Sequence, residues 1–255
     1  MKPKVAIFDL TDCEGCEVQI LNSKFIDRIL EGVEFLHFRL GQRVNRWEEF
    51  DVAFIEGAVI TSHELELVKK IREHSKFVVA LGSCACFGGI AALNNFIGVN
   101  EAKKYVYGEN ADKIETLYIK PLPEIIKVDF MIRGCPIVPE DFERLVSDLF
   151  AGRIPREHTR PVCMDCKSKG NACFLLEGVE CAGPVTYGGC GAPCPSSGMP
   201  CDGCRGPLEE PEMSAELELL KMIASKHDIV RLFRKYAPMA PLFKEIGVRI
   251  DDSIR

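Results

Sequence analysis

The sequence predicts an α/β protein with a doubly wound parallel sheet, followed by an irregular cysteine-rich region and C-terminal helices. Two observations support this prediction. In the first part of the chain, short apolar segments alternate with segments of helical periodicity, as in βα units. From Cys163 to Cys204, eight of the 13 cysteines occur within 42 residues, among glycines and prolines. Few residues there could build a packed core, and helical periodicity returns only after Pro211.

The individual elements follow from apolar patterning and turn residues. Apolar runs predict five strands, at residues 5–10, 33–40, 52–55, 77–81 and 128–132. Helical spacing predicts helices at residues 17–30, 61–74, 90–96 and 139–150, and after the cysteines at 213–225, 228–236 and 242–250. Thr61 and Glu64 form a capping-box pattern at the start of the helix at 61–74. Gly152 is placed to end the helix at 139–150. Residues 82–89 are expected to be a Gly-rich loop, and residues 97–127 show no clear pattern.

Length and charge limit the classes of function. A chain of 255 residues allows one large domain or a domain with a smaller one, and we predict domains at residues 1–152 and 153–255. The net charge of −6 argues against nucleic acid as the main partner and against an anionic membrane surface. No apolar run is long enough to span a bilayer directly. The first ten residues show no export pattern, so we expect a cytoplasmic protein.

Four cysteines are expected to meet at one edge of the predicted sheet. Cys13, Cys84 and Cys135 each follow the carboxyl end of a strand, and Cys16 shares a CxxC motif with Cys13. In open α/β sheets these ends form the ligand crevice. Each cysteine alone could be a small buried hydrophobe. Glycines lie beside every member of the set and let the backbone approach a cluster closely, so we favour metal ligation for these four cysteines. We interpret Cys86, which is not in the set, as a spare thiol.

The other eight cysteines make two further sets of four. Each set of four thiolates can complete the shell of one tetrahedral metal ion or one [4Fe–4S] cluster. Without an export signal, disulfide bonds are the less favoured interpretation, although disulfide-rich intracellular proteins of hyperthermophiles are an alternative.

Four signatures together resemble the small, electron-transfer subunit of [NiFe] hydrogenases. They are Cys13-Glu-Gly-Cys16, Gly82-Ser-Cys84 with Gly88-Gly89, Gly134-Cys135-Pro136, and the run Cys181-Ala-Gly-Pro184…Cys190…Cys201-Asp-Gly-Cys204. The resemblance spans residues 1 to about 208. Within this family, the chain most resembles the cytoplasmic type, such as the sulfhydrogenase delta subunit or the methyl-viologen-reducing hydrogenase small subunit. It implies a flavodoxin-like N-terminal domain and an iron–sulfur C-terminal domain.

The resemblance also implies three groups of ligands. The proximal set comprises Cys13, Cys16, Cys84 and Cys135; the distal set comprises Cys163, Cys166, Cys173 and Cys181; the medial set comprises Cys190, Cys194, Cys201 and Cys204. Many periplasmic relatives have a His where this chain has Cys163, and a Pro in place of a fourth medial ligand. Because Cys194 is present here, three [4Fe–4S] clusters are expected. Asp12 stands where some relatives have an acidic residue linked to proton movement, but it is equally well explained as a turn-capping Asp.

The implied function is electron transfer within a multi-subunit hydrogenase that oxidises or evolves H2. The Ni–Fe site would lie in a partner large subunit, and a further flavoprotein or iron–sulfur subunit would exchange electrons with this chain. The sequence carries no convincing nucleotide-binding fingerprint. Two alternatives stay open: a complex-I-like cluster subunit of another oxidoreductase, which the eight later cysteines disfavour, and a zinc-stabilised interaction module.

Overall fold

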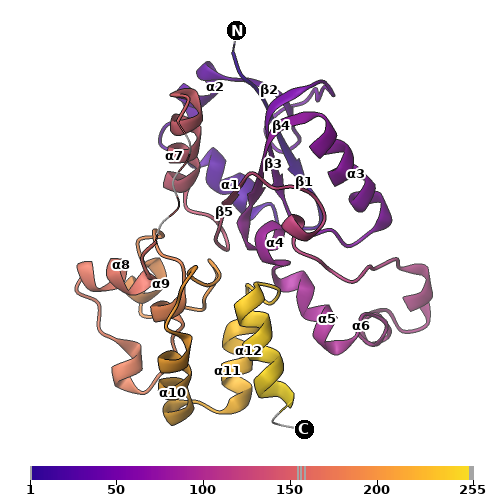
Figure 1. Ribbon diagram of the computed structural model, residues 1–255. Helices are drawn as coiled ribbons and strands as arrows, with labels where there is room; N and C mark the ends of the chain where they lie inside the picture. The colour runs from indigo at the N-terminus through magenta and orange to yellow at the C-terminus, as the bar shows by residue number, and fades with distance from the viewer. Residues whose placement is uncertain (1, 154, 156, 158, 253–255) are drawn as a thin grey trace. The chain divides into compact units, whose positions relative to one another are not determined.

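Five parallel strands form one sheet in the N-terminal part of the chain (Figure 1). The computed structural model describes residues 2–153, 155, 157 and 159–252. The strands are β1 (Lys4–Asp9), β2 (Glu34–Phe38), β3 (Phe50–Glu56), β4 (Ser75–Leu81) and β5 (Phe130–Ile132), in the order β2-β1-β3-β4-β5. This is the flavodoxin-like order, whose topological switch point lies between β1 and β3. The α/β prediction is therefore confirmed.

Helices cover both faces of this sheet because its central strands are apolar on both sides. β3 and β4 are buried almost throughout. One core cluster joins residues of β1, β3 and β4 to three helices, α1 (Gly15–Leu21), α2 (Ile26–Gly32) and α7 (Pro139–Phe150). On the opposite face lies α3 (Ser62–Glu73), whose N-terminus carries the predicted capping box of Thr61 and Glu64 (Figure 1).

Three sequence-based predictions in this part were wrong. The helix expected at residues 17–30 is two helices, because the Ser23 hydroxyl accepts the N–H of Phe25 and donates to Glu143, which replaces helical bonds. The expected loop at residues 82–89 begins with a short helix, α4 (Gly82–Phe87), which ends at Gly88 in a left-handed conformation. The single helix expected at residues 90–96 is instead a 3₁₀ turn, Ile90–Leu93, followed by α5 (Asn94–Ile97). Residues 97–127, for which the sequence showed no clear pattern, contain α6 (Val99–Tyr107) and 3₁₀ turns at Gly108–Lys113 and Leu122–Glu124.

The chain divides into two compact units, residues 1–155 and 156–255. In the second unit, isolated bridges such as Pro161 to Tyr187 and Thr186 to Pro207 join irregular segments. Its helices are α8 (Val162–Ser168), α9 (Pro193–Ser196), α10 (Met213–Ile223), α11 (Lys226–Arg234) and α12 (Pro241–Asp252), with 3₁₀ turns at Phe174–Glu177 and Gly183–Val185. The division into domains after residue 152 stays a prediction.

No single helix among the described residues is long and apolar enough to cross a membrane. One bent pair, Gly82–Ile97 with Val99–Lys113, meets the length and composition criteria together.

Candidate iron–sulfur cluster sites

The turn between β1 and α1 carries Cys13 and Cys16. The carboxylate of Asp12 accepts the N–H of Glu14 at 2.9 Å, and Glu14 adopts a left-handed conformation with φ of 56°. This turn leaves Cys13 exposed and places Cys16, buried, in the first turn of α1. Asp12 therefore has the turn-capping role that was one of its two interpretations; its part in proton movement stays a prediction.

Glu56, at the end of β3, holds the start of α1 across the switch point. Its two carboxylate oxygens accept the N–H groups of Cys16 (3.0 Å) and Glu17 (2.8 Å). The first N–H groups of a helix have no partner within the helix, so this buried carboxylate satisfies two of them. Sequence reasoning missed Glu56, although its place at the end of a strand was the same signal that selected the cysteines.

Cys84 and Cys135 reach the same edge from β4 and β5. The N–H of Ser83 donates to the carbonyl of Gly134 at 2.8 Å, which joins the two turns. A β-carbon at residue 89 would lie 2.5 Å from Sγ of Cys84, so only glycine fits beside this sulfur.

Electrostatic coupling shows that the proximal set lies together. The pKa of Cys84 is raised to about 12, mainly by burial and then by the neighbouring Cys135 and Cys13. Burial also raises the pKa of Cys135, and Cys13 is the next cause. Burial likewise raises the pKa of Cys16, with smaller contributions from Glu56 and Cys84. The structure thus places Cys13, Cys16, Cys84 and Cys135 near one another, and their role as ligands of one cluster stays a prediction.

Cys86 lies apart from this group. Its buried sulfur is 3.6 Å from the carbonyl of Ala80 and 3.7 Å from that of Ile132, inside the core under α4. This position agrees with the interpretation of Cys86 as a thiol outside the proximal set.

The distal set gathers around α8 in the second unit. The pKa of Cys163 is raised to about 12, mainly by burial and then by repulsion from Cys181, Cys166 and Cys173. A β-carbon at Gly183 would lie 3.1 Å from Sγ of Cys163 and 3.5 Å from that of Cys181, so these sulfurs share one neighbour.

The medial set lies beside the distal set. Burial raises the pKa of Cys201, and Cys181, Cys204 and Cys190 are close enough to add to the effect. Cys194 in turn raises the pKa of Cys190, after burial as the main cause. The N–H of Cys201 donates to Sγ of Cys181 at 3.2 Å, so a medial residue bonds directly to a distal sulfur.

The donor chemistry of the three sets fits iron–sulfur clusters. Buried thiols with raised pKa values ionise together only when bound metal shares their negative charge. Among the described residues, no three His, Cys, Asp or Glu side chains are arranged around a single metal ion. In a [4Fe–4S] cluster, four thiolates hold the cluster as a whole and need not converge on one ion.

A buried acid lies next to the proximal set and was not predicted. Glu17 is almost fully buried, and within the described part of the chain neither of its carboxylate oxygens has a hydrogen-bond partner. Burial raises its pKa to about 8, with Asp9 and Glu56 as further causes. The sequence offered no signal for Glu17, because its burial depends on how α1 packs on the sheet.

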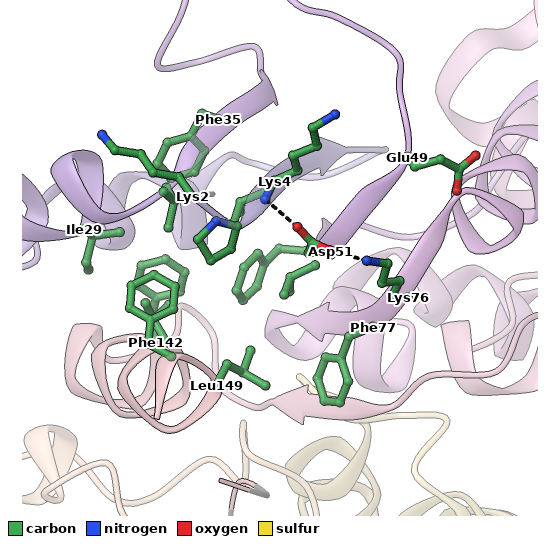
Figure 2. Close-up of a pocket in the computed structure, with 17 residues that line it drawn as sticks. Lys2, Lys4, Ile29, Phe35, Glu49, Asp51, Lys76, Phe77, Phe142 and Leu149 are labelled. Atoms are coloured by element: carbon green, nitrogen blue, oxygen red, sulfur yellow. Dashed lines mark hydrogen bonds and ion pairs between the residues drawn. The ribbon is translucent and has the colours of Figure 1, made fainter. Parts of the chain in front are cut away.

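A separate cavity of about 670 Å³ lies at the other edge of the sheet (Figure 2). It is lined near the amino ends of the strands by apolar side chains such as Phe35, Phe77 and Phe142, while Asp51 accepts the backbone N–H of Lys4 and pairs with Lys76. No cysteine lines this cavity, so it is distinct from the cluster edge.

A flavodoxin-like sheet with four thiols at its ligand edge, followed by eight more in an irregular unit, is an arrangement typical of iron–sulfur proteins. The chain belongs to the family described as NADH ubiquinone oxidoreductase, 20 Kd subunit, which it matches over residues 13–149.

Known relatives are hydrogenase subunits. The chain is 36% identical to sulfhydrogenase 2 subunit delta of Pyrococcus furiosus, covering 92% of this chain and 99% of that protein. It is 33% identical to a vhu subunit of the F420-non-reducing hydrogenase of Methanococcus voltae, covering 82% and 84%. A chain of an NAD+-reducing [NiFe]-hydrogenase structure in the H2-reduced state is 27% identical, with a TM-score of 0.57 over 61% of this chain and 95% of that one.

Proposed function

We propose that this chain is the iron–sulfur electron-transfer subunit of a [NiFe] hydrogenase. The observation that carries the proposal is the meeting of Cys13, Cys16, Cys84 and Cys135 at the switch point of the sheet. The hydrogenase names of the relatives that match nearly the whole chain support it. The family's own description favours a complex-I-like subunit, but that match ends at residue 149, before the distal and medial sets.

The proximal, medial and distal sets are proposed to hold one [4Fe–4S] cluster each. Bound clusters would supply one-electron transfer between a Ni–Fe site and a redox partner. The protein contributes burial, N–H groups near sulfur, such as that of Cys201, and acidic residues such as Glu56, all of which set cluster potentials.

The proposed partner is a large subunit that holds the Ni–Fe site. A surface that we call the partner face follows directly after the proximal loop and carries exposed apolar side chains: Ile90, Ile97, Tyr105, Val106, Tyr107, Ile114 and Tyr118. Figure 1 shows α5 and α6 of this surface extending away from the sheet. Several exposed apolar side chains within one short stretch of chain favour a protein interface there. A second redox subunit and a cytoplasmic location complete the proposal.

Metal analysis tests the proposal. The chain, co-expressed anaerobically with its large subunit, should be brown and contain about twelve iron atoms with matching acid-labile sulfide in this subunit. Cys194→Ser should convert one cluster to a [3Fe–4S] form with its own EPR signal. The isolated chain should show neither nickel nor hydrogen-dependent dye reduction. Colourless protein containing zinc would support the interaction module instead.

A further inference from the structure

Asp165 lies within the distal CxxC motif, yet its carboxylate bonds to the segment that carries Cys190. It lies on α8 between Cys163 and Cys166 and is buried. Oδ2 accepts the N–H groups of Gly189 (2.8 Å) and Gly191 (3.2 Å), the two neighbours of the medial residue Cys190. One oxygen of Asp165, a residue of the distal motif, therefore holds the backbone on both sides of Cys190, which belongs to the medial set.

Arg160 completes the environment of this carboxylate. Its guanidinium lies 3.0 Å from Oδ1 of Asp165, so each carboxylate oxygen has a cationic or N–H partner. Hydrogen bonds to an ionised group are stronger than neutral ones, especially when the group is buried. The contact thus has the chemistry of a persistent structural link.

The backbone on both sides of Cys190 needs such a link. Gly189 and Gly191 have φ values of 93° and 70°, a region that residues with side chains rarely adopt, and neither lies in a helix or strand. The preceding residues run beside residues 160–162: Gly188 donates its N–H to the carbonyl of Arg160 at 2.8 Å. A β-carbon at Gly188 would lie 2.6 Å from that oxygen, so the two segments are in close contact.

We propose that Asp165 is a positioning residue that fixes Cys190 for the medial cluster from within the distal ligand motif. The inference rests on the proposed function. It predicts that removing the Asp165 carboxylate disturbs the medial cluster more than the distal cluster, although Asp165 is adjacent in sequence to distal ligands only. The geometry of the two clusters is then coupled through this one side chain.

Asp202 provides a matched control. It lies within the medial CxxC motif, between Cys201 and Cys204, and its carboxylate pairs with Lys235 at 2.7 Å on a partly exposed surface. Asp202→Asn therefore removes the same charge next to medial ligands and leaves the Gly189 and Gly191 contacts in place. Arg160→Ala is a second control, because it removes the ion pair but keeps the contacts to both glycines.

The experiment is an EPR-monitored redox titration of the complex with its large subunit. Cys194→Ser and Cys173→Ser assign the medial and distal signals. In Asp165→Leu, which offers no acceptor oxygen to Gly189 and Gly191, the medial signal should broaden and its midpoint potential should shift more than in Asp202→Asn or Arg160→Ala, with the distal signal nearly unchanged. In Asp165→Ala, iron should fall from about twelve to about eight atoms on anaerobic gel filtration, through loss of the medial cluster.

Two results would overturn the inference. One is a change confined to the distal signal, and the other is a medial shift no larger in Asp165→Leu than in Asp202→Asn. Should Asp165→Ala not accumulate as folded protein, Asp165→Leu decides alone, since it keeps the side-chain shape and has no acceptor oxygen for Gly189 and Gly191. A wild-type chain without iron would refute the proposed function itself, whereas wild-type clusters with an unaffected medial signal would refute only the role of Asp165.

Discussion

Gly82 lies against the sulfur of Cys16 so closely that a β-carbon at residue 82 would overlap Sγ. Gly82 also has a φ of 79°, which turns the chain from β4 into α4. The same residue thus allows the turn that carries Cys84 and leaves room for a thiolate from a different turn. The proximal set depends on this absence of a side chain.

Gly82→Ala should therefore abolish the proximal cluster. The added methyl group would displace Cys16, and we expect loss of about four of twelve iron atoms together with the proximal EPR signal. Gly152→Ala is the matched control, because Gly152 has a φ of 65° but no neighbouring atom within 4 Å. It should cost only the strain of a left-handed residue, about 1–2 kcal/mol, with full iron content. Equal iron loss in both variants would show that backbone strain, not overlap with sulfur, is responsible.

The two thiols of α4 should respond in opposite ways to the same substitution. Cys84→Ser should lose the proximal cluster, because a serine hydroxyl is a poor substitute for a thiolate ligand. Cys86→Ser should keep about twelve iron atoms, since its hydroxyl can still donate to the carbonyl of Ala80 or Ile132. Its thermal midpoint should change by an amount equivalent to about 1 kcal/mol or less. Iron analysis of both variants decides, and the reverse pattern would mean that Cys86 is the ligand.

Stability should depend on pH through Glu216 of α10. Burial raises its pKa from 4.5 to about 7, so between these values the folded protein holds a proton that the unfolded chain has released. Protonated Glu216 therefore makes its full contribution to the free energy of unfolding below pH 4.5, and this contribution is lost as the pH rises through about 7. Glu216→Gln removes the dependence. Its gain in stability over the wild type should be small at pH 5 and reach about 2–3 kcal/mol at pH 8.

Differential scanning calorimetry of the anaerobic complex at pH 5, 6, 7 and 8 measures this effect. Glu218→Gln is the control, because Glu218 is exposed on the same helix and should show no pH-dependent gain. A gain for Glu216→Gln that is the same at all four pH values would contradict a raised pKa for Glu216.

The partner face should be needed for association with the large subunit. Tyr105 is 91% exposed and lies beside Val106, which is also exposed. Tyr105→Glu should weaken the complex at least about tenfold if the ring is an anchor of the interface. Val44→Glu places the same charge at another exposed apolar residue of this unit and should leave association unchanged. Co-purification and analytical ultracentrifugation measure both, and undiminished association of Tyr105→Glu would place the interface elsewhere.

Much of the sheet and the proximal set could be predicted from sequence. The runs around Val52 and Val78 are apolar at consecutive positions, as is typical of strands buried on both faces. Once the strands are parallel, their carboxyl ends share an edge, so Cys13, Cys84 and Cys135 had to approach one another. The break at Ser23 was not predictable in this way, because it depends on Glu143, 120 residues away.

The sequence by itself determined which residues have the chemistry to bind clusters, because thiols and glycines carry that information locally. Tertiary structure decided which neighbours control them. Glu56 and Glu17 became part of the proximal site only when α1 docked on the sheet. Asp165 reached Gly189 and Gly191 only when segments 24 and 26 residues apart came together. A hydrogen bond between distant segments depends on the position of whole elements, and that position is set by the packing of the core rather than by any local pattern.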